Sequence, residues 1–293
     1  MTTIGLIGLG DMGAAVGRTL KGAGHRVVSV FQGRSEDSVR RANAAGIEAC
    51  ASLDRMIDEA SIILSVVPPG EARAAALGVA DALEDYVGET IFADLNAIAP
   101  ETTKILASEI SYAGGVFVDG GIIGASPYKT PVKTRVYLSG HDAARLTSLS
   151  TDEMDVRLCG SDIGQASGLK MTYAALTKGT AALQAAVVIA ANEMGLYEPL
   201  AQEFEESQKD RFALMRMSVP FLAADSVRWA DEMDEIAASF AAVGVTPKFH
   251  EGAGELFRLL AKTPLEAETR ETMDRARTLE EALKIYSEAI GKG

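Results

Sequence analysis

Short apolar runs alternate with amphipathic segments through the first half of this chain. Apolar runs, which predict strands, lie at 3–7, 26–31, 62–67, 90–94, 116–121, 136–139 and 156–159. Segments of helical periodicity lie between them at 14–22, 35–45, 52–59, 70–83 and 100–112. This alternation is typical of an α/β fold. We therefore expect an N-terminal Rossmann-type, doubly wound sheet that is mostly parallel and has helices on both faces.

The pattern changes near residue 160, where the strand signals end. Helical periods follow at 163–194, 198–216, 224–243, 252–261 and 265–290. We therefore predict two domains, a Rossmann domain over 1–160 and an all-α domain over 161–293. Alanines between 181 and 191 in the long first helix indicate close helix packing, either within the chain or in a two-fold homodimer built on the helical domain. The pattern leaves both interpretations open.

A glycine-rich segment follows the first predicted strand, with the sequence Gly8-Leu9-Gly10-Asp11-Met12-Gly13. A strand, then G-x-G-x-x-G, then a helix is the dinucleotide-binding fingerprint. The first glycine permits a tight turn, the second lets a pyrophosphate approach the backbone, and the third lets the helix pack on the strand. The N–H groups that begin the helix then face the phosphates. The segment predicts a dinucleotide site.

The end of the second strand indicates which dinucleotide binds. An NAD enzyme usually has Asp or Glu there for the ribose 2′-hydroxyl, whereas this chain continues as Gln32-Gly33-Arg34-Ser35. The Arg34 guanidinium is suited to grip a 2′-phosphate as a fork, and Ser35 to donate to it. A solvated loop arginine is the other interpretation, and Glu36 weakens the pattern. We expect NADP rather than NAD.

Two later strand ends also suggest cofactor contacts. Val67, Pro68 and Pro69 form a rigid loop that is suited to flank the cofactor, although prolines after a strand also simply end it. Asn96 both donates and accepts, which suits a nicotinamide carboxamide or a ribose hydroxyl. The competing interpretation of Asn96 is a turn or helix-cap residue.

The predicted substrate residues lie at the next strand end and in the long helix. Gly121 and Gly124 flank Ile122 and Ile123, so a ligand can approach the backbone of Ile122, Ile123 and Gly124, or the segment is an ordinary loop. Lys170 lies in the first turns of the long helix among small and apolar residues, and Lys178 follows two turns later. Desolvation lowers the pKa of an ammonium group, so Lys170 is a candidate general acid and base, unless it is a surface lysine between the domains.

Composition limits the partners and the compartment. The 293-residue chain is 47% hydrophobic and carries a net charge of −13, which argues against nucleic acid and favours a small-molecule substrate. Cys50 and Cys159 have no paired spacing and the three histidines are scattered, so we expect no metal site and no disulfide. No apolar run reaches eighteen residues and no signal peptide precedes the first strand, so we expect a cytoplasmic protein without a membrane span.

Taken together, these segments resemble the β-hydroxyacid dehydrogenase superfamily, which includes 3-hydroxyisobutyrate and 6-phosphogluconate dehydrogenases. The fingerprint matches the family's G-L-G-x-M-G, and Gly33-Arg34-Ser35 resembles the N-R-[ST] of its NADP-using members. Residues 164–170 resemble the G-x-G-x-x-x-K segment, with Ala166 in place of the second glycine. The resemblance implies that Lys170 is the catalytic lysine, which exchanges a proton with the substrate oxygen.

The chain departs from the family where that family binds the substrate carboxylate. The serine of D-x-P-V-S-G-G is Ile123, the asparagine three residues after the lysine is Tyr173, and the later K-D-L appears as 234–236, Asp-Glu-Ile. Each change removes a polar or positive group from the expected pocket. Tyr173 is suited to donate its phenol to the substrate beside Lys170, or it is a packed aromatic. These features resemble a subgroup whose C-terminal helical domain has no assigned function.

The sequence therefore predicts an NADP-dependent oxidoreductase that acts on CH–OH. It would transfer a hydride between NADP(H) and the hydroxyl or carbonyl carbon of a small hydroxy acid or related alcohol. Two other functions stay open. One is reduction of C=N bonds, as in the imine reductases that resemble this fold, and the other is a non-catalytic NADP(H)-binding redox sensor.

Overall fold

The computed structural model describes residues 1–84 and 86–290. The chain divides into two compact units, Met1–Met171 and Thr172–Gly293. The division falls inside the long helix α6 (Gln165–Glu193). The hydrophobic pattern places a domain boundary near residue 160, just before this helix, and that boundary stays a prediction.

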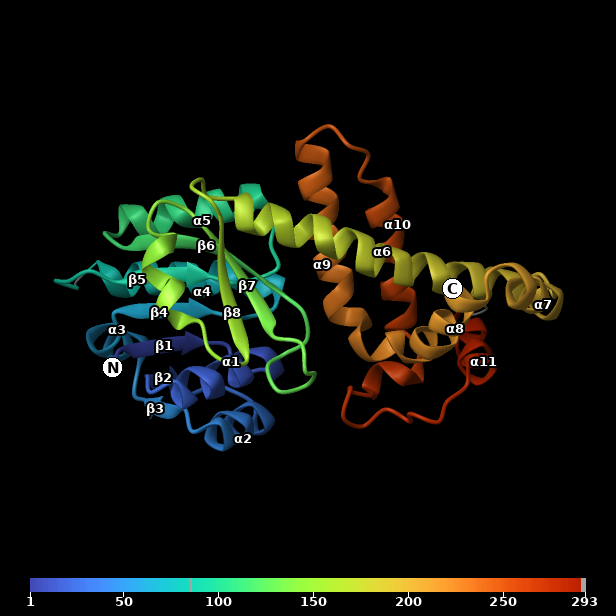
Figure 1. The fold of residues 1–293 in the computed structure, drawn as a ribbon, viewed down its shortest axis with the longest axis horizontal. Coiled ribbons are helices and arrows are strands. Elements are labelled where there is room, and N and C mark those ends of the chain that lie inside the picture. Colours follow the sequence, from blue (N-terminus) through green and yellow to red (C-terminus); the bar gives the residue numbers. More distant parts are fainter. Residues whose placement is uncertain (85, 291–293) are drawn as a thin grey trace. The chain divides into compact units, whose positions relative to one another are not determined.

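An eight-stranded sheet forms the centre of the first unit (Figure 1). Its strands are β1 (Thr3–Ile7), β2 (Arg26–Val30), β3 (Glu48–Cys50), β4 (Ile62–Ser65), β5 (Ile91–Asp94), β6 (Val116–Ile123), β7 (Thr134–Ser139) and β8 (Met154–Gly160). Their order is β3-β2-β1-β4-β5-β6-β7-β8, and all neighbours are parallel except β6 and β7. The predicted Rossmann-type sheet is confirmed. Strand β3 was missed because its three residues lie at the sheet edge and have no buried apolar side.

Helices cover both faces of this sheet. They are α1 (Asp11–Gly22), α2 (Glu36–Ala45), α3 (Leu53–Glu59), α4 (Pro69–Leu83) and α5 (Pro100–Tyr112), with the 3-10 helix η1 (Ala143–Leu149). One apolar cluster joins the sheet to α1 and η1 through Val16, Leu20 and Leu146. A second cluster joins its other side to α3, α4 and α5 through Ile57, Val79 and Leu106. Burial on both sides explains why the strands read as nearly continuous apolar runs.

The strand register brings four chain segments to one edge of the sheet. Ser65, the last residue of β4, pairs with Ile7 of β1 and with Asp94 of β5. Asp94 pairs in turn with Asp119 of β6. The loops that follow β1, β4 and β5 therefore begin side by side, at the carboxyl edge where open α/β sheets bind their ligands.

The second unit contains helices and no strand among its described residues. Besides most of α6, it contains α7 (Tyr197–Ser207), α8 (Lys209–Ser218), η2 (Val219–Asp225), α9 (Ser226–Ala242), α10 (Lys248–Leu260), η3 (Pro264–Ala267) and α11 (Leu279–Ile290). Antiparallel packing of α9 and α10, together with α11, buries Met233, Phe257 and Tyr286. The predicted all-α region is confirmed.

Two of the predicted helices in this unit are wrong in extent. The helix expected at 198–216 is interrupted at Gln208, whose φ of −142° and ψ of 40° are not helical. The helix expected at 265–290 is a 3-10 turn followed by α11, and residues 268–278 are not helical. This polar stretch ends at a capping box: Thr278 Oγ1 accepts from the Glu281 N–H (3.2 Å) and Glu281 Oε2 accepts from the Thr278 N–H (2.9 Å).

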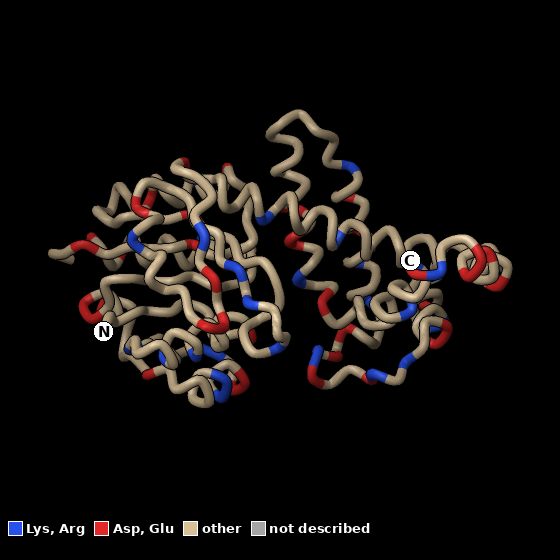
Figure 2. Tube along the Cα trace, in the orientation of Figure 1, with Lys and Arg blue, Asp and Glu red and all other residues tan. Residues whose placement is uncertain are grey.

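Helix α6 is the one helix among the described residues that is long and apolar enough to cross a membrane. Within the second unit, its Asn192 donates to Ser287 of α11 (2.9 Å), and Lys178 forms an ion pair with Glu232 of α9. Ala182 and Ala185 are buried, whereas Ala186 is exposed. Such contacts are typical of a helix that packs in a globular core. Acidic and basic residues are interspersed along both units (Figure 2).

Candidate functional site

The fingerprint turn has the geometry that its glycines predict. Gly8 has a φ of +104°, and a Cβ there would lie 2.0 Å from the carbonyl oxygen of Val66. A Cβ on Gly13 would lie 2.0 Å from the carbonyl oxygen of Gly8, so α1 packs tightly on the turn. A Cβ on Gly10 would meet nothing within 4 Å. Two glycines are therefore required by packing, and the middle one leaves the backbone open to a ligand.

The start of α1 offers backbone donors rather than side chains. Its N-cap is Gly10, which has no side chain to cap the helix, so the first N–H groups can bind a phosphate. The side chain of Leu9 is buried and that of Met12 packs against the same apolar cluster. The buried Leu9 side chain and the partly buried Met12 side chain hold the turn in place. The turn fits the pyrophosphate of a dinucleotide.

An exposed turn follows β2. The Arg34 N–H donates to the carbonyl of Phe31 (3.1 Å), and Gly33 has a φ of +76°. Ser35 is the N-cap of α2 and accepts from the Ser38 N–H (3.3 Å). Gln32, Gly33, Arg34 and Ser35 are all exposed. A guanidinium thus lies next to the positive end of a helix, whose first turn also carries the carboxylates of Glu36 and Asp37.

Asn96 connects the ends of β4 and β5. Its Oδ1 accepts from the Val67 N–H (2.7 Å), and its Nδ2 donates to Ser65 Oγ (2.9 Å) and Asp94 Oδ2 (2.8 Å). Asn96 is 2% exposed, so this amide shapes the loop that carries Val67. Pro68 is the exposed N-cap of α4, and Pro69 is its buried first residue. Direct contacts of Val67, Pro68, Pro69 and Asn96 with a cofactor stay predictions.

Asp94 is a buried carboxyl with neutral partners. Burial raises its pKa to about 7, against the opposing effect of hydrogen bonds from the N–H and side chain of Asn96. The nearby Asp119 carboxylate adds to the rise in the pKa of Asp94. Near neutral pH this carboxyl therefore exchanges a proton with little cost.

Asp119 joins the sheet to the start of α6, a role that no local pattern in the sequence indicates. Its side chain is fully buried in the middle of β6. Oδ2 accepts from the N–H groups of Gly164 (2.9 Å), Ala166 (3.0 Å) and Ser167 (3.2 Å) and from Ser139 Oγ (2.8 Å). The Ser167 hydroxyl donates to Oδ1. One carboxylate thus caps the helix that carries Lys170.

Gly121 brings α6 against the end of β6. A Cβ on Gly121 would lie 2.8 Å from Lys170 Cβ and 3.0 Å from the carbonyl oxygen of Ala166. The absence of a side chain at 121 therefore sets the position of Lys170, which is half-buried. The structure brings Lys170 to the sheet edge where the fingerprint turn also lies.

The predicted substrate segment has buried side chains and an exposed end. Ile122 is 5% exposed and Ile123 is 4% exposed, so these side chains belong to the core and only their backbone can face a ligand. Gly124 is exposed and has a φ of +116°. Substrate contacts at Ile122, Ile123 and Gly124 stay predictions.

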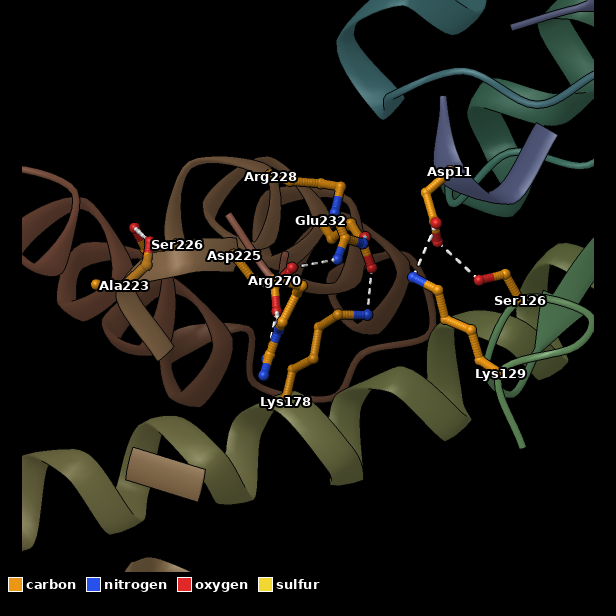
Figure 3. A network of polar contacts seen from close by, with 10 residues as sticks. All are labelled: Asp11, Ser126, Lys129, Lys178, Ala223, Asp225, Ser226, Arg228, Glu232 and Arg270. Carbon is orange, nitrogen blue, oxygen red and sulfur yellow. Dashed lines mark hydrogen bonds and ion pairs between the residues drawn. The ribbon is translucent and has the colours of Figure 1, made fainter. Parts of the chain in front are cut away.

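In the second unit, Tyr173 is exposed and Lys178 is buried. Lys178 forms an ion pair with Glu232 (Figure 3). The Lys178 Nζ also lies 5.7 Å from the centre of the Trp229 ring. Glu232 also accepts from Arg228 (2.7 Å). The Lys178 ammonium is therefore neutralised within its own unit, and its predicted role as a substrate ligand stays a prediction.

No group of three or more histidine, cysteine or carboxylate side chains with metal-binding geometry occurs among the described residues. Within the same part of the chain, Cys50 and Cys159 are both free thiols. Burial raises the pKa of the Cys159 thiol, and the Asp119 carboxylate adds to that rise. This thiol is therefore poorly suited to act as a nucleophile.

Comparison with known proteins identifies both regions of the chain. Residues 3–145 match the NAD binding domain of 6-phosphogluconate dehydrogenase, and residues 191–260 match a domain of unknown function, DUF1932. An uncharacterized 28.5 kDa protein of Methanothermus fervidus is 30% identical over 71% of this chain and 78% of its own. The 3-hydroxyisobutyrate dehydrogenase of Pseudomonas aeruginosa is 31% identical over 43% of each chain.

Residues 3–145 belong to the family of the 6-phosphogluconate dehydrogenase NAD binding domain, and the homologues of this chain are 3-hydroxyisobutyrate dehydrogenase-like. The Mycobacterium tuberculosis 3-hydroxyisobutyrate dehydrogenase structure with L-serine has a TM-score of 0.67, 20% identity, and coverage of 89% of this chain and 94% of that one. A Streptomyces aurantiacus imine reductase has a TM-score of 0.53, 19% identity, and coverage of 92% and 97%. At these identities both structures show the fold alone.

The comparisons confirm the predicted family and fold. They also show that the cofactor is a nicotinamide dinucleotide and that the family is one of hydroxyacid dehydrogenase-like oxidoreductases. The alignment with the P. aeruginosa enzyme spans less than half of its length, at 43%. The substrate and the choice between NADP and NAD are therefore matters for proposal.

Proposed function

We propose that this protein is an NADP-dependent oxidoreductase that transfers a hydride between NADP(H) and a hydroxyl or carbonyl carbon. The observation that carries this proposal is the capping of α6 by Asp119. It holds Lys170 against Gly121, at the same sheet edge as the fingerprint turn. A dinucleotide fold alone would bind a cofactor, whereas a positioned lysine adds the proton transfer that the reaction requires.

The 2′-phosphate of NADP is assigned to the turn after β2. Arg34 is exposed there beside the N-terminus of α2, and no carboxylate occupies positions 32–35. An arginine side chain presents several donors in a fork that matches a phosphate group. Replacing Arg34 with Gln is expected to weaken NADPH binding about tenfold and to leave NADH binding unchanged, as measured by ligand fluorescence titration.

Lys170 is assigned the role of general acid and base. The nicotinamide ring supplies or accepts the hydride when the cofactor is bound. During oxidation the neutral lysine accepts the hydroxyl proton of the substrate, and during reduction the ammonium returns a proton to the carbonyl oxygen. Lys170 is half-buried and its Cβ lies against Gly121, so the start of its side chain is held in place.

The substrate class is inferred from the residues that would otherwise bind a charged group. Ile123 occupies the position of a polar family residue, and its side chain is buried in the core. Lys178 is neutralised by Glu232. We assign a small hydroxy acid or a related alcohol that carries little charge, with Tyr173 as a second donor to the substrate oxygen.

Replacement of Lys170 with Met tests the catalytic role. Turnover of NADP with a panel of hydroxy acids and alcohols is expected to fall by about a thousandfold, the scale of an essential acid–base group. NADPH affinity should change by less than about threefold, because the phosphates bind elsewhere. The matched control is Lys104→Met, since Lys104 is an exposed lysine of the same unit. Turnover that survives in Lys170→Met contradicts the mechanism.

Substrate screening separates this proposal from its two alternatives. Cyclic imines reduced with NADPH faster than any carbonyl compound would indicate an imine reductase, with Tyr173, which is 46% exposed, as the proton donor. Tight NADPH binding without turnover on either panel would indicate a redox sensor. Oxidation of a hydroxy acid or alcohol that depends on Lys170 supports the dehydrogenase.

We also propose a homodimer built on the helical unit. Leu176, Leu183 and Met194 of this unit are 73%, 65% and 70% exposed, more apolar surface than one helix usually leaves to water. Sedimentation analysis should show a dimer, which Leu176→Glu combined with Leu183→Glu converts to a monomer. Exposed Met217→Glu in α8 is the control.

The free thiols of Cys50 and Cys159 support a reducing, cytoplasmic setting.

A further inference from the structure

The loop between β6 and β7 is attached to the fingerprint helix of the same unit. Lys129 Nζ lies 2.8 Å from Asp11 Oδ1, and Ser126 Oγ donates to Asp11 Oδ2 (2.7 Å), as Figure 3 shows. Asp11 is the first residue of α1 and the fourth residue of the glycine fingerprint. The loop therefore brings an ammonium group to the turn that binds the cofactor phosphates.

The shape of the loop supports a specific contact. Tyr128 has a φ of +71°, a left-handed conformation that costs free energy for a residue with a side chain. Its ring packs under the Arg18 guanidinium at 4.4 Å, two turns after Asp11 on the same helix. Thr134 Oγ1 donates to the carbonyl of Ala125 (2.6 Å) at the base of the loop. The loop therefore lies along one side of α1.

Asp11 poses an electrostatic problem for a phosphate site. A carboxylate in the first turn favours the helix itself, but it repels the anion that the same turn binds. Burial acts to raise the pKa of Asp11, yet the hydrogen bonds and charge of Lys129 and the hydrogen bond from Ser126 outweigh it and lower that pKa. The side chain is therefore ionised at neutral pH, and the site needs a cation beside it.

We propose that Lys129 is a ligand of the cofactor's pyrophosphate, and that Asp11 and Ser126 position its ammonium at the start of α1. Lys129 is 48% exposed, so its flexible side chain has room to reach an anion at the exposed Gly10. The inference rests on the proposed function only through the bound dinucleotide. It depends neither on the NADP preference of Arg34 nor on catalysis by Lys170.

Binding titrations of Lys129→Met test this role without any turnover. NADPH, NADH and ADP share a pyrophosphate, so their dissociation constants are each expected to rise about tenfold, the scale of a lost charge-assisted hydrogen bond. Lys133→Met is the matched control, because Lys133 is an exposed lysine of the same loop that contacts the carbonyl of Thr151 (3.2 Å). Equal melting temperatures by circular dichroism would show that both variants fold.

A second substitution tests the counter-charge. In Lys129→Met the Asp11 carboxylate is left beside the phosphates, so adding Asp11→Asn should recover at least a third of the lost binding free energy. An ADP affinity within twofold of wild type in Lys129→Met overturns the proposal. A loss confined to NADPH also overturns it, because that result would assign Lys129 to the 2′-phosphate. If Arg34→Gln did not change NADPH binding, or Lys170→Met did not change turnover, the ADP affinity expected for Lys129→Met would be the same.

Discussion

The two units bury carboxylates in opposite ways. In the first unit, Asp119 is surrounded by neutral donors, namely backbone N–H groups and serine hydroxyls. In the second unit, Glu232 is 3% exposed and is held by two cations, Lys178 and Arg228. Arg228 and Arg270 then share Asp225 (Figure 3).

This difference between the two carboxylates shows two separate roles: Asp119 positions a helix, whereas the cations around Glu232 balance its charge. Backbone N–H groups are directional and belong to the helix itself, so Asp119 determines where α6 begins and hence where Lys170 lies. The cations around Glu232 are long side chains that mainly cancel its charge. A buried ion pair can often be exchanged for apolar residues, whereas a helix cap cannot.

The largest effect is expected from Glu232→Leu. This change leaves the Lys178 ammonium buried without its counter-ion, which costs about 4 kcal/mol of unfolding free energy. Urea unfolding followed by fluorescence measures it in the second unit, because Trp229, the chain's one tryptophan, lies beside Lys178. Adding Lys178→Met should recover most of the loss. A double variant as unstable as the single one would show that the pair positions the helices.

Asp119→Ala is expected to cost about 3 kcal/mol, because several N–H groups at the start of α6 lose their acceptor. Turnover should also fall at least tenfold, since Lys170 is no longer held at Gly121, while NADPH affinity stays within about threefold. Urea unfolding by circular dichroism and steady-state kinetics measure the two effects. Ser139→Ala, which removes one of these donors, is the control at about 1 kcal/mol. Unchanged turnover in Asp119→Ala contradicts the positioning role.

The pH dependence of stability reports on Asp94. Its pKa is about 7 in the folded protein against 3.8 as the ordinary value, so between these values the folded state holds a proton that the unfolded state has released. The unfolding free energy should therefore decrease as pH rises through this window. Asp94→Asn removes this contribution. The difference in unfolding free energy between the wild type and Asp94→Asn should therefore narrow or reverse as the pH rises toward 7. A difference that is constant with pH contradicts the assignment.

The smallest effect is expected at an exposed ion pair. Lys104 contacts Glu101 at 2.6 Å on α5, and both side chains are more than half exposed. Replacing Lys104 with Ala should change the unfolding free energy by less than about 0.5 kcal/mol, because water screens such pairs. Urea unfolding provides the measurement. A loss of unfolding free energy in Lys104→Ala as large as that in Glu232→Leu would contradict the difference in energy between buried and exposed ion pairs.

Much of the fold could be predicted because it depends on local patterns. Buried parallel strands read as apolar runs, and the fingerprint requires only a strand, three glycines and a helix start. The capping box of Thr278 and Glu281 was also readable, and attention to it would have corrected the helix expected at 265–290. Strand β3 lacked any such signal, because an exposed three-residue edge strand has no hydrophobic pattern.

The site was harder to predict because its partners are distant in the chain. Asp119 and Gly164 are separated by 45 residues, and Ser126 and Asp11 by 115. A carboxylate within a strand, such as Asp119, is consistent with many roles until the tertiary structure shows which N–H groups approach it. Likewise, no spacing rule distinguishes Lys178, neutralised by Glu232, from a lysine that is free to bind substrate.

The sequence by itself determined the alternation of strands and helices, the dinucleotide turn, and the resemblance to a family in which the lysine at position 170 is catalytic. Each of these depends on residues within one or two adjacent elements. Only the tertiary structure decided that Asp119 caps α6 and that Lys129 meets Asp11. Hydrogen bonds and ion pairs act over a few ångströms in space. Their partners are therefore chosen by the packing of the chain rather than by its order.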